Sequence, residues 1–168
     1  MSVGTTVSDQ TSGRPSILTI NGGSSSVKFA LFDAADPSTR KLCGRIERIG
    51  QPESWLVVDN CDADAAEDGE VDVPDHAAAA RLIIERLGKE SILVVGHRIV
   101  HGGGKFQGPE RVTPQLLDEL RRICPYDPDH LPDEIALIEA FASSATSSTV
   151  SPISAALAPM PNRTSATG

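Results

Sequence analysis

One segment near the start of the chain, INGGSSSVKF at residues 20–29, combines residue types that can hold a phosphate group. Glycines let a backbone approach a bulky anion, and consecutive backbone N–H groups can form a concave nest around it. Serine hydroxyls add donors, an asparagine oxygen can hold a hydrated Mg²⁺ ion through water, and a lysine adds positive charge. A plain hairpin is the alternative, because Asn-Gly between apolar runs is the strongest short hairpin signal. The residues alone leave both interpretations open.

A second segment, GHRIVHGGGKF at residues 96–106, places Arg98 just after the apolar run ILVV. An unpaired guanidinium beside a buried run is costly, so we expect a carboxylate or phosphate partner. That partner is either an internal acid or a bound anion. His97 and His101 would stand about 13 Å apart on a strand, which makes joint metal ligation an unattractive interpretation. The chain contains neither GxxxxGK[ST] nor GxGxxG.

The elements that must position these residues follow from the apolar pattern. Strands are predicted at residues 17–20, 26–33, 41–49 and 54–58, and their close spacing predicts an antiparallel meander.

Helices and one more strand are predicted in the second half. Asp75 can cap a helix that ends at Gly88, the run from residue 92 is typical of a buried strand, and Thr113 with Pro114 begins another helix. A last helix is predicted over PDEIALIEAF, residues 132–141. This order predicts an α/β fold, a mixed sheet with helices on its faces.

Composition narrows the function. The chain has 168 residues and a net charge of -8, which argues against nucleic-acid binding. Eight acids between Asp59 and Asp75 are expected on a solvated loop or face. The three cysteines show no paired spacing, so we expect buried thiols in a reducing compartment. No apolar run is long enough to span a membrane, and a cytoplasmic protein is expected.

Both ends of the chain differ from the middle. Residues 1–15 are predicted to be a disordered leader, and residues 142–168 a low-complexity, disordered tail with eleven Ser or Thr and one charged residue. The abrupt change at Ala142 is typical of out-of-frame translation. Reading the downstream DNA in the other two frames would test that hypothesis.

Taken together, INGGSSSVKFALFD and GHRIVHGGGKF resemble the start of acetate kinase, in the family of acetate, propionate and butyrate kinases. The resemblance covers about residues 17–141. It implies a ribonuclease-H-like fold of the actin-like superfamily, with residues 16–141 forming part of the N-terminal domain. It also implies reversible phosphoryl transfer from ATP to acetate, giving acetyl phosphate and ADP with Mg²⁺. A homodimer is a further expectation that the resemblance implies.

The resemblance also implies roles for single residues. Asn21 matches the family's magnesium-associated asparagine, Ser24 and Ser26 match serines near the nucleotide phosphates, and Lys28 matches a lysine that contacts ATP. These matches favour a phosphate-binding turn over a plain hairpin.

For the substrate, Arg98 matches the arginine that binds the carboxylate or the moving phosphoryl group, and Val100 a side chain of the acetate pocket. The family often has a histidine-asparagine stretch within residues 123–131. This chain has ICPYDPDHL there, with Asp127 where the histidine is expected.

The resemblance implies that the catalytic aspartate lies in an FDTAF-like motif, which does not follow Phe141 within these 168 residues, and the resemblance reaches only the first of the family's two domains. No catalytic residue is therefore assigned, and low activity is expected of this chain alone. The alternative function is a non-catalytic fragment that binds phosphate or a protein partner.

Overall fold

The computed structural model describes most of the chain. The described residues are 14–60, 66–88, 90–100, 105–106, 108–145 and 156–159.

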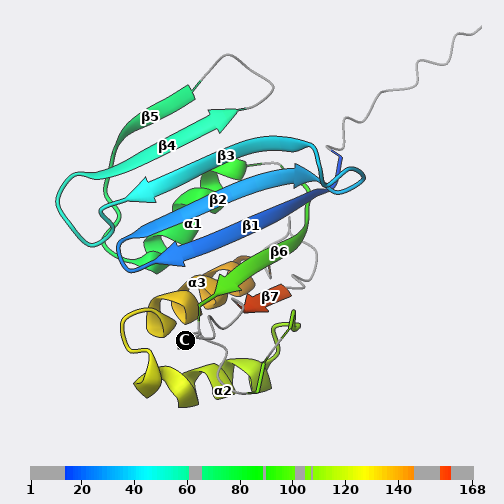
Figure 1. Cartoon of the computed structure of the whole chain (residues 1–168). Coiled ribbons are helices and arrows are strands. Elements are labelled where there is room, and N and C mark those ends of the chain that lie inside the picture. Colours follow the sequence, from blue (N-terminus) through cyan, green and yellow to red (C-terminus); the bar gives the residue numbers. More distant parts are fainter. Residues whose placement is uncertain are drawn as a thin grey trace, which may run out of the picture.

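Five consecutive strands form an antiparallel meander, which the sequence predicts with its first four strands (Figure 1). They are β1 (Ser16–Gly23), β2 (Ser26–Asp33), β3 (Arg40–Glu47), β4 (Ser54–Asn60) and β5 (Ala66–Val71). The first four confirm the predicted strands, with ends that differ by a few residues.

Strand β5 corrects one expectation, because it lies in the acidic stretch that was expected as a loop or face. Its side chains are mostly exposed, and it pairs with β4 at the edge of the sheet. Exposed acidic side chains suit an edge strand, since they discourage pairing with another chain.

The sheet becomes mixed on its other side. Strand β6 (Ile92–Ile99) runs parallel to β1, and the short β7 (Ala156–Pro159) runs parallel to β6. The strand order is β5-β4-β3-β2-β1-β6-β7. Strand β1 is therefore an interior strand, with β2 antiparallel on one side and β6 parallel on the other.

Helix α1 (His76–Leu87) begins and ends where the sequence predicts. The Asp75 side chain accepts a hydrogen bond of 2.6 Å from the Ala78 N–H, which satisfies a donor in the first turn. Gly88 ends the helix with φ 55°, a conformation that glycine adopts without a steric penalty.

Helix α2 (Pro114–Ile123) also begins as predicted, with Thr113 accepting from the Leu116 N–H at 3.2 Å. A short 3₁₀ turn, η1 (Cys124–Tyr126), leads into α3 (Leu131–Ala145). Helix α3 extends four residues past the predicted end at 141.

Helices α1 and α3 cover one face of the sheet, and α2 packs against α3 (Figure 1). Inward side chains such as Leu18, Ile20 and Phe29 meet Ile83 of α1 and Phe141 of α3 in one core. A second, smaller core lies between α2 and α3, around Leu120. The alternating side chains of β1 and β2 that point the other way are more exposed.

The predicted domain ends differ from what is described. Pro15, placed in the predicted leader, accepts a hydrogen bond from the Ala34 N–H at 2.9 Å, and β7 lies within the predicted tail. Residues 142–145, also placed in the predicted tail, form the last turn of α3. Disorder in residues 1–13, 146–155 and 160–168 stays a prediction, because those residues lie outside the described part. Cys43 and Cys124 are free thiols, half-buried where burial was expected, and Cys61 is not described.

Candidate functional site

The segment at residues 20–29 is a hairpin, but its turn is not at Asn-Gly. Asn21 pairs with Lys28, Gly22 with Val27 and Gly23 with Ser26, so the chain reverses at residues 24–25. Asn21 stays in the strand because β1 also pairs with β6 as far as this residue. The hairpin signal therefore located the reversal three residues too early.

A buried histidine of α1 holds this turn from the helix-covered side. The Nε2 atom of His76 lies 2.7 Å from the Gly23 carbonyl oxygen, and its Nδ1 atom lies 3.3 Å from Oδ1 of Asp133 in α3. A trans peptide is planar, so fixing the Gly23 carbonyl directs the Ser24 N–H the opposite way. The contact thus orients one of the backbone donors of the candidate phosphate-binding turn.

Three predicted site residues lie in one row across the sheet. Asn21 of β1 is opposite Lys28 of β2 and, on its other side, opposite Arg98 of β6. Partners in register share a face of the sheet. This face is opposite to the one covered by α1 and α3, because the neighbouring Ile20 and His97 point into the core.

Arg98 and Asn21 are in direct contact. The Nη1 atom of Arg98 donates to Oδ1 of Asn21 at 3.0 Å. Among the residues that the structure describes, neither Arg98 nor Lys28 forms an ion pair. The internal acid that was one expected partner of Arg98 is thus absent from the described region, and the row keeps two positive charges.

The backbone at the end of β6 is held by an acid that sequence reasoning missed. The Val100 N–H donates to both carboxylate oxygens of Glu134, at 3.1 and 3.3 Å. Glu134 is only 3% exposed, and burial raises its pKa to about 7, although the Val100 N–H and the charge of Arg98 act in the opposite direction. The available signal was an acid in the first turn of a predicted helix.

A histidine does lie in the segment where Asp127 replaces the expected one. The Nδ1 atom of His130 lies 2.8 Å from Oδ1 of Asp127, and this hydrogen bond raises the pKa of His130. Asp127 therefore supports an imidazole that the chain supplies three residues later. No role was predicted for His130 from the sequence.

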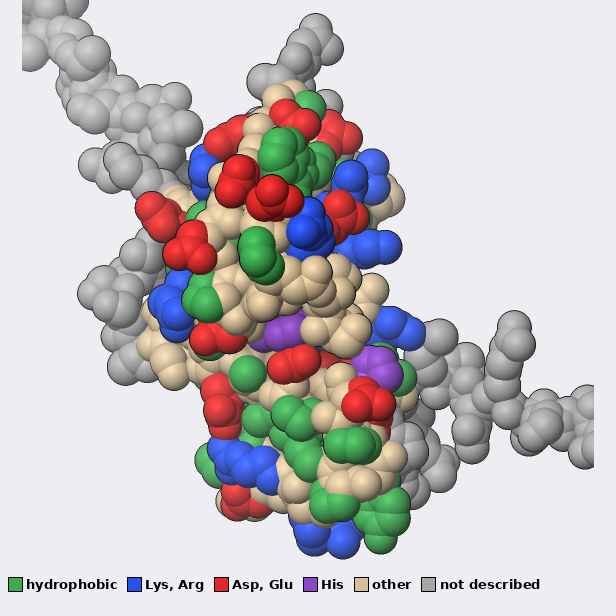
Figure 2. Space-filling model, turned by 90° about the vertical axis from the view of Figure 1, so that its left-hand side faces the viewer, with side chains coloured by type: hydrophobic (Ala, Val, Ile, Leu, Met, Phe, Trp, Pro, Cys, Tyr) green, Lys and Arg blue, Asp and Glu red, His purple; other side chains and the backbone are tan. Residues whose placement is uncertain are grey.

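The side of the molecule that lies at the left of Figure 1, toward which β1 runs, carries histidine and acidic side chains across its middle (Figure 2). No group of three or more His, Cys, Asp or Glu side chains in the described part could hold a metal ion. Asn21 offers a single oxygen, which suits a water-mediated contact to an Mg²⁺ ion carried by phosphates rather than a protein-made cage. None of the helices described is both long and apolar enough to cross a membrane.

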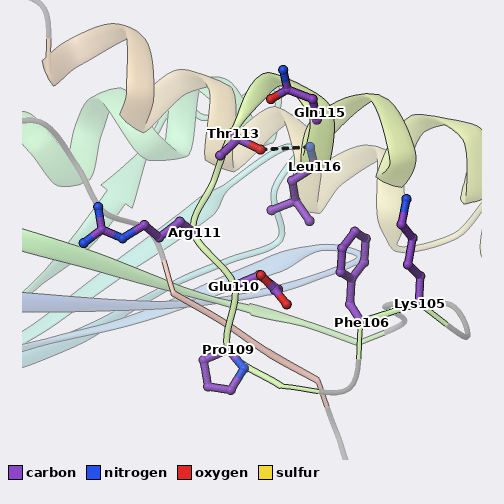
Figure 3. Close-up of a pocket in the computed structure, with 8 residues that line it drawn as sticks. All are labelled: Lys105, Phe106, Pro109, Glu110, Arg111, Thr113, Gln115 and Leu116. Carbon is purple, nitrogen blue, oxygen red and sulfur yellow. Dashed lines mark hydrogen bonds between the residues drawn. The ribbon is translucent and has the colours of Figure 1, made fainter.

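A separate pocket of about 490 Å³ lies beside the start of α2 (Figure 3). It is lined by Lys105, Phe106, Pro109, Glu110, Arg111, Thr113, Gln115 and Leu116. Lys105 and Phe106 end the segment GHRIVHGGGKF and Thr113 caps α2, but the pocket contains none of the residues predicted to bind nucleotide, substrate or Mg²⁺. The charged row across the strands is the better candidate because its residues converge by register.

Comparison with known proteins decides the family. The sequence profile of the acetokinase family matches residues 16–154, most of the chain. The chain belongs to the acetokinase family. The matched range runs past residue 141, where the resemblance was expected to end.

Individual acetokinase relatives give the same result. Acetate kinase of Streptomyces griseus is 40% identical over 128 residues, which cover 71% of this chain and 31% of the relative. Acetate kinase of Bacillus subtilis is 37% identical over 134 residues, which cover 74% of this chain and 33% of the relative. The chain thus spans about a third of the length of these relatives.

Solved acetokinase structures confirm the predicted fold class. Porphyromonas gingivalis acetate kinase superposes with a TM-score of 0.72 at 26% identity, over 86% of this chain and 37% of that one. A propionate kinase of Francisella tularensis gives a TM-score of 0.73 at 23% identity, over 86% of this chain and 36% of that one, and supports the fold alone. The sheet and helices form part of an actin-like kinase fold.

Proposed function

We propose that this chain supplies the phosphate- and carboxylate-binding part of an acetate kinase-type phosphotransferase. The proposed reaction is reversible transfer of a phosphoryl group from ATP to acetate, giving acetyl phosphate and ADP. The observation that carries the proposal is the row of Arg98, Asn21 and Lys28 beside the turn at residues 24–25.

The proposed roles follow from charge and position. Phosphoryl transfer requires mainly alignment and neutralisation of charge, and an acetate nucleophile is already ionised at pH 7. Arg98 would bind the carboxylate or the moving phosphoryl group, next to Val100, a residue that is 36% exposed just past the end of β6. Ser24, Ser26 and Lys28 would bind the nucleotide phosphates.

Magnesium enters this proposal with the nucleotide. Mg²⁺ keeps several waters and binds mostly through substrate phosphates, so Asn21 would contact it through water. The ion would neutralise charge on the phosphates when bound. Asn21 would meanwhile hold the Arg98 guanidinium in place.

A second candidate function remains because the chain covers about a third of its curated relatives. A fragment that binds phosphate without turnover would use the same residues, and the uncompensated charge of Arg98 favours anion binding in either case. A homodimer and a cytoplasmic location are further proposals that follow from the family.

An assay with the purified chain tests these proposals. Heat of binding is measured with MgADP and acetyl phosphate, and ATP formation is followed, for the wild type, Arg98→Ala and Arg86→Ala. Arg86 pairs with Glu67 on the exposed side of the protein and serves as the control. We expect Arg98→Ala to weaken binding roughly tenfold or more, because one charge-assisted hydrogen bond is lost. Arg86→Ala should leave binding and ATP formation unchanged.

The outcomes separate the two functions. ATP formation that Arg98→Ala abolishes supports the phosphotransferase. Arginine-dependent binding without ATP formation supports the non-catalytic module. Absence of binding by the wild type would contradict both.

A further inference from the structure

We propose that Glu134 is a positioning residue that sets how strongly the Arg98 site binds a carboxylate, through its own charge and its hold on the Val100 amide. The inference deepens the proposed function and rests on it. Glu134 lies on α3, outside the strands that carry the row of Arg98, Asn21 and Lys28. It would act on a bound anion through β6 and Arg98.

The geometry places the Glu134 carboxylate between the ends of two strands. Its oxygens accept from the Val100 N–H at the end of β6. A Cβ atom on Gly22 of β1 would lie 4.0 Å from the Glu134 Cγ atom and 2.7 Å from the Leu137 Cδ1 atom. The missing side chain at Gly22 thus lets α3 approach β1 closely enough for Glu134 to reach β6.

Charged groups surround Glu134 from several elements. Arg98 of β6 and His130, just before α3, favour its ionised form, while Asp127 and burial favour its neutral form. His76 of α1 contacts the neighbouring Asp133 instead. With a pKa of about 7, Glu134 changes charge in the pH range in which an acetate-type ligand remains ionised.

The sign of the effect follows from linkage. Ionised Glu134 and a bound carboxylate carry like charges close to Arg98. Binding of the carboxylate therefore raises the Glu134 pKa. The same coupling means that protonated Glu134 favours binding. Affinity should be highest below pH 7 and should fall as pH rises through 7.

A purely structural role predicts something else. In that case Glu134 would only satisfy the Val100 N–H, and a glutamine, whose side-chain oxygen also accepts, would replace it without changing the pH dependence of binding. The pH profile of Glu134→Gln therefore separates a charge-setting role from a structural one.

The experiment is an NMR titration of the ¹⁵N-labelled chain with acetate at pH 6.0 and pH 8.5, followed at the amides of Arg98 and Val100. Wild type, Glu134→Gln and Glu139→Gln are compared. Glu139 lies on the same helix, pairs with Arg121 and is 44% exposed, so it is a matched control. We expect about tenfold weaker binding at pH 8.5 in the wild type and in Glu139→Gln, which corresponds to one pKa unit of coupling, and no pH dependence in Glu134→Gln.

Other results overturn the inference. A pH dependence that survives in Glu134→Gln would assign the effect to another group, such as His130, and wild-type affinity that is equal at both pH values would exclude coupling. Either result leaves the proposed function intact. If acetate does not perturb Arg98 at either pH, the proposed function fails together with the inference.

Discussion

Arg98 donates to the side-chain oxygen of Asn21 at 3.0 Å, so its partner in the described region is a neutral amide. An amide orients the guanidinium without cancelling its charge, which a carboxylate would do. The sequence indicated that Arg98 needs a partner but did not distinguish an internal acid from a bound anion. That distinction depends on the register between β1 and β6, which are about 75 residues apart in the chain and share no local signal.

Glu134 and His130 differ in how far their contacts lie along the chain. The pKa of Glu134 is altered by burial beside β6, and the pKa of His130 is altered by Asp127. Only the second contact lies within three residues in the sequence, so only that one had a local signal.

His97 gives a prediction about acid stability. The residue is 3% exposed, and its ring packs edge-on against that of Phe141, with the ring centroids 5.5 Å apart. Its Nε2 atom has no hydrogen-bond partner among the described residues. Burial lowers its pKa to about 4, below the ordinary 6.5, so the unfolded chain binds the proton first. Stability from neutral His97 is complete above pH 6.5 and is lost as pH falls toward 4.

Urea unfolding at pH 7.5 and pH 5.0 checks this. The free energy of unfolding of the wild type should fall by about 2 kcal/mol more than that of His97→Leu, since 1.5 pH units below 6.5 correspond to that energy. An equal fall in both proteins would show that His97 is not the group responsible.

Helix and strand positions were largely predictable because each has a local cause. The side chains of Asp75 and Thr113 cap the starts of α1 and α2, respectively, and Gly88 ends α1. The position of the hairpin turn and the existence of β5 were not predictable, because both depend on pairing with another strand. Local residues thus determine where the helices begin and end, whereas pairing with a neighbouring strand determines where some of the strands end.

Gly44, near the middle of β3, is closely packed against the strands on both sides. A Cβ atom on Gly44 would lie 2.4 Å from the Phe29 ring and 2.6 Å from the Val57 carbonyl oxygen, so a strand backbone would have to move. Gly44→Ala should therefore lower the free energy of unfolding by about 1–3 kcal/mol.

Gly69→Ala in β5 is the matched control, since nothing lies within 4 Å of its added Cβ atom. Its free energy of unfolding should stay within about 0.5 kcal/mol of the wild type. Equal urea midpoints for Gly44→Ala and Gly69→Ala would argue against the close packing of Phe29 on β3.

Across the whole molecule, helices α1 and α3 cover one face of the sheet (Figure 1). The row of Arg98, Asn21 and Lys28 lies on the other face, by strand register. The chain carries a net charge of -8, so this local positive row contrasts with the protein's overall charge. A field of this kind attracts an anion at short range, within about a Debye length of 8–10 Å. The family assignment, the fold and the charge of the row all support the proposed anion site at the ends of β1 and β6.

Chemical-shift mapping with MgATP tests that claim most directly. In the ¹⁵N-labelled chain, the account predicts that MgATP shifts amides from Asn21 to Lys28 and at Arg98, and that Arg98→Ala reduces these shifts while leaving the rest of the spectrum unchanged. Shifts confined to the pocket beside α2, or no shifts at saturating MgATP, would contradict it.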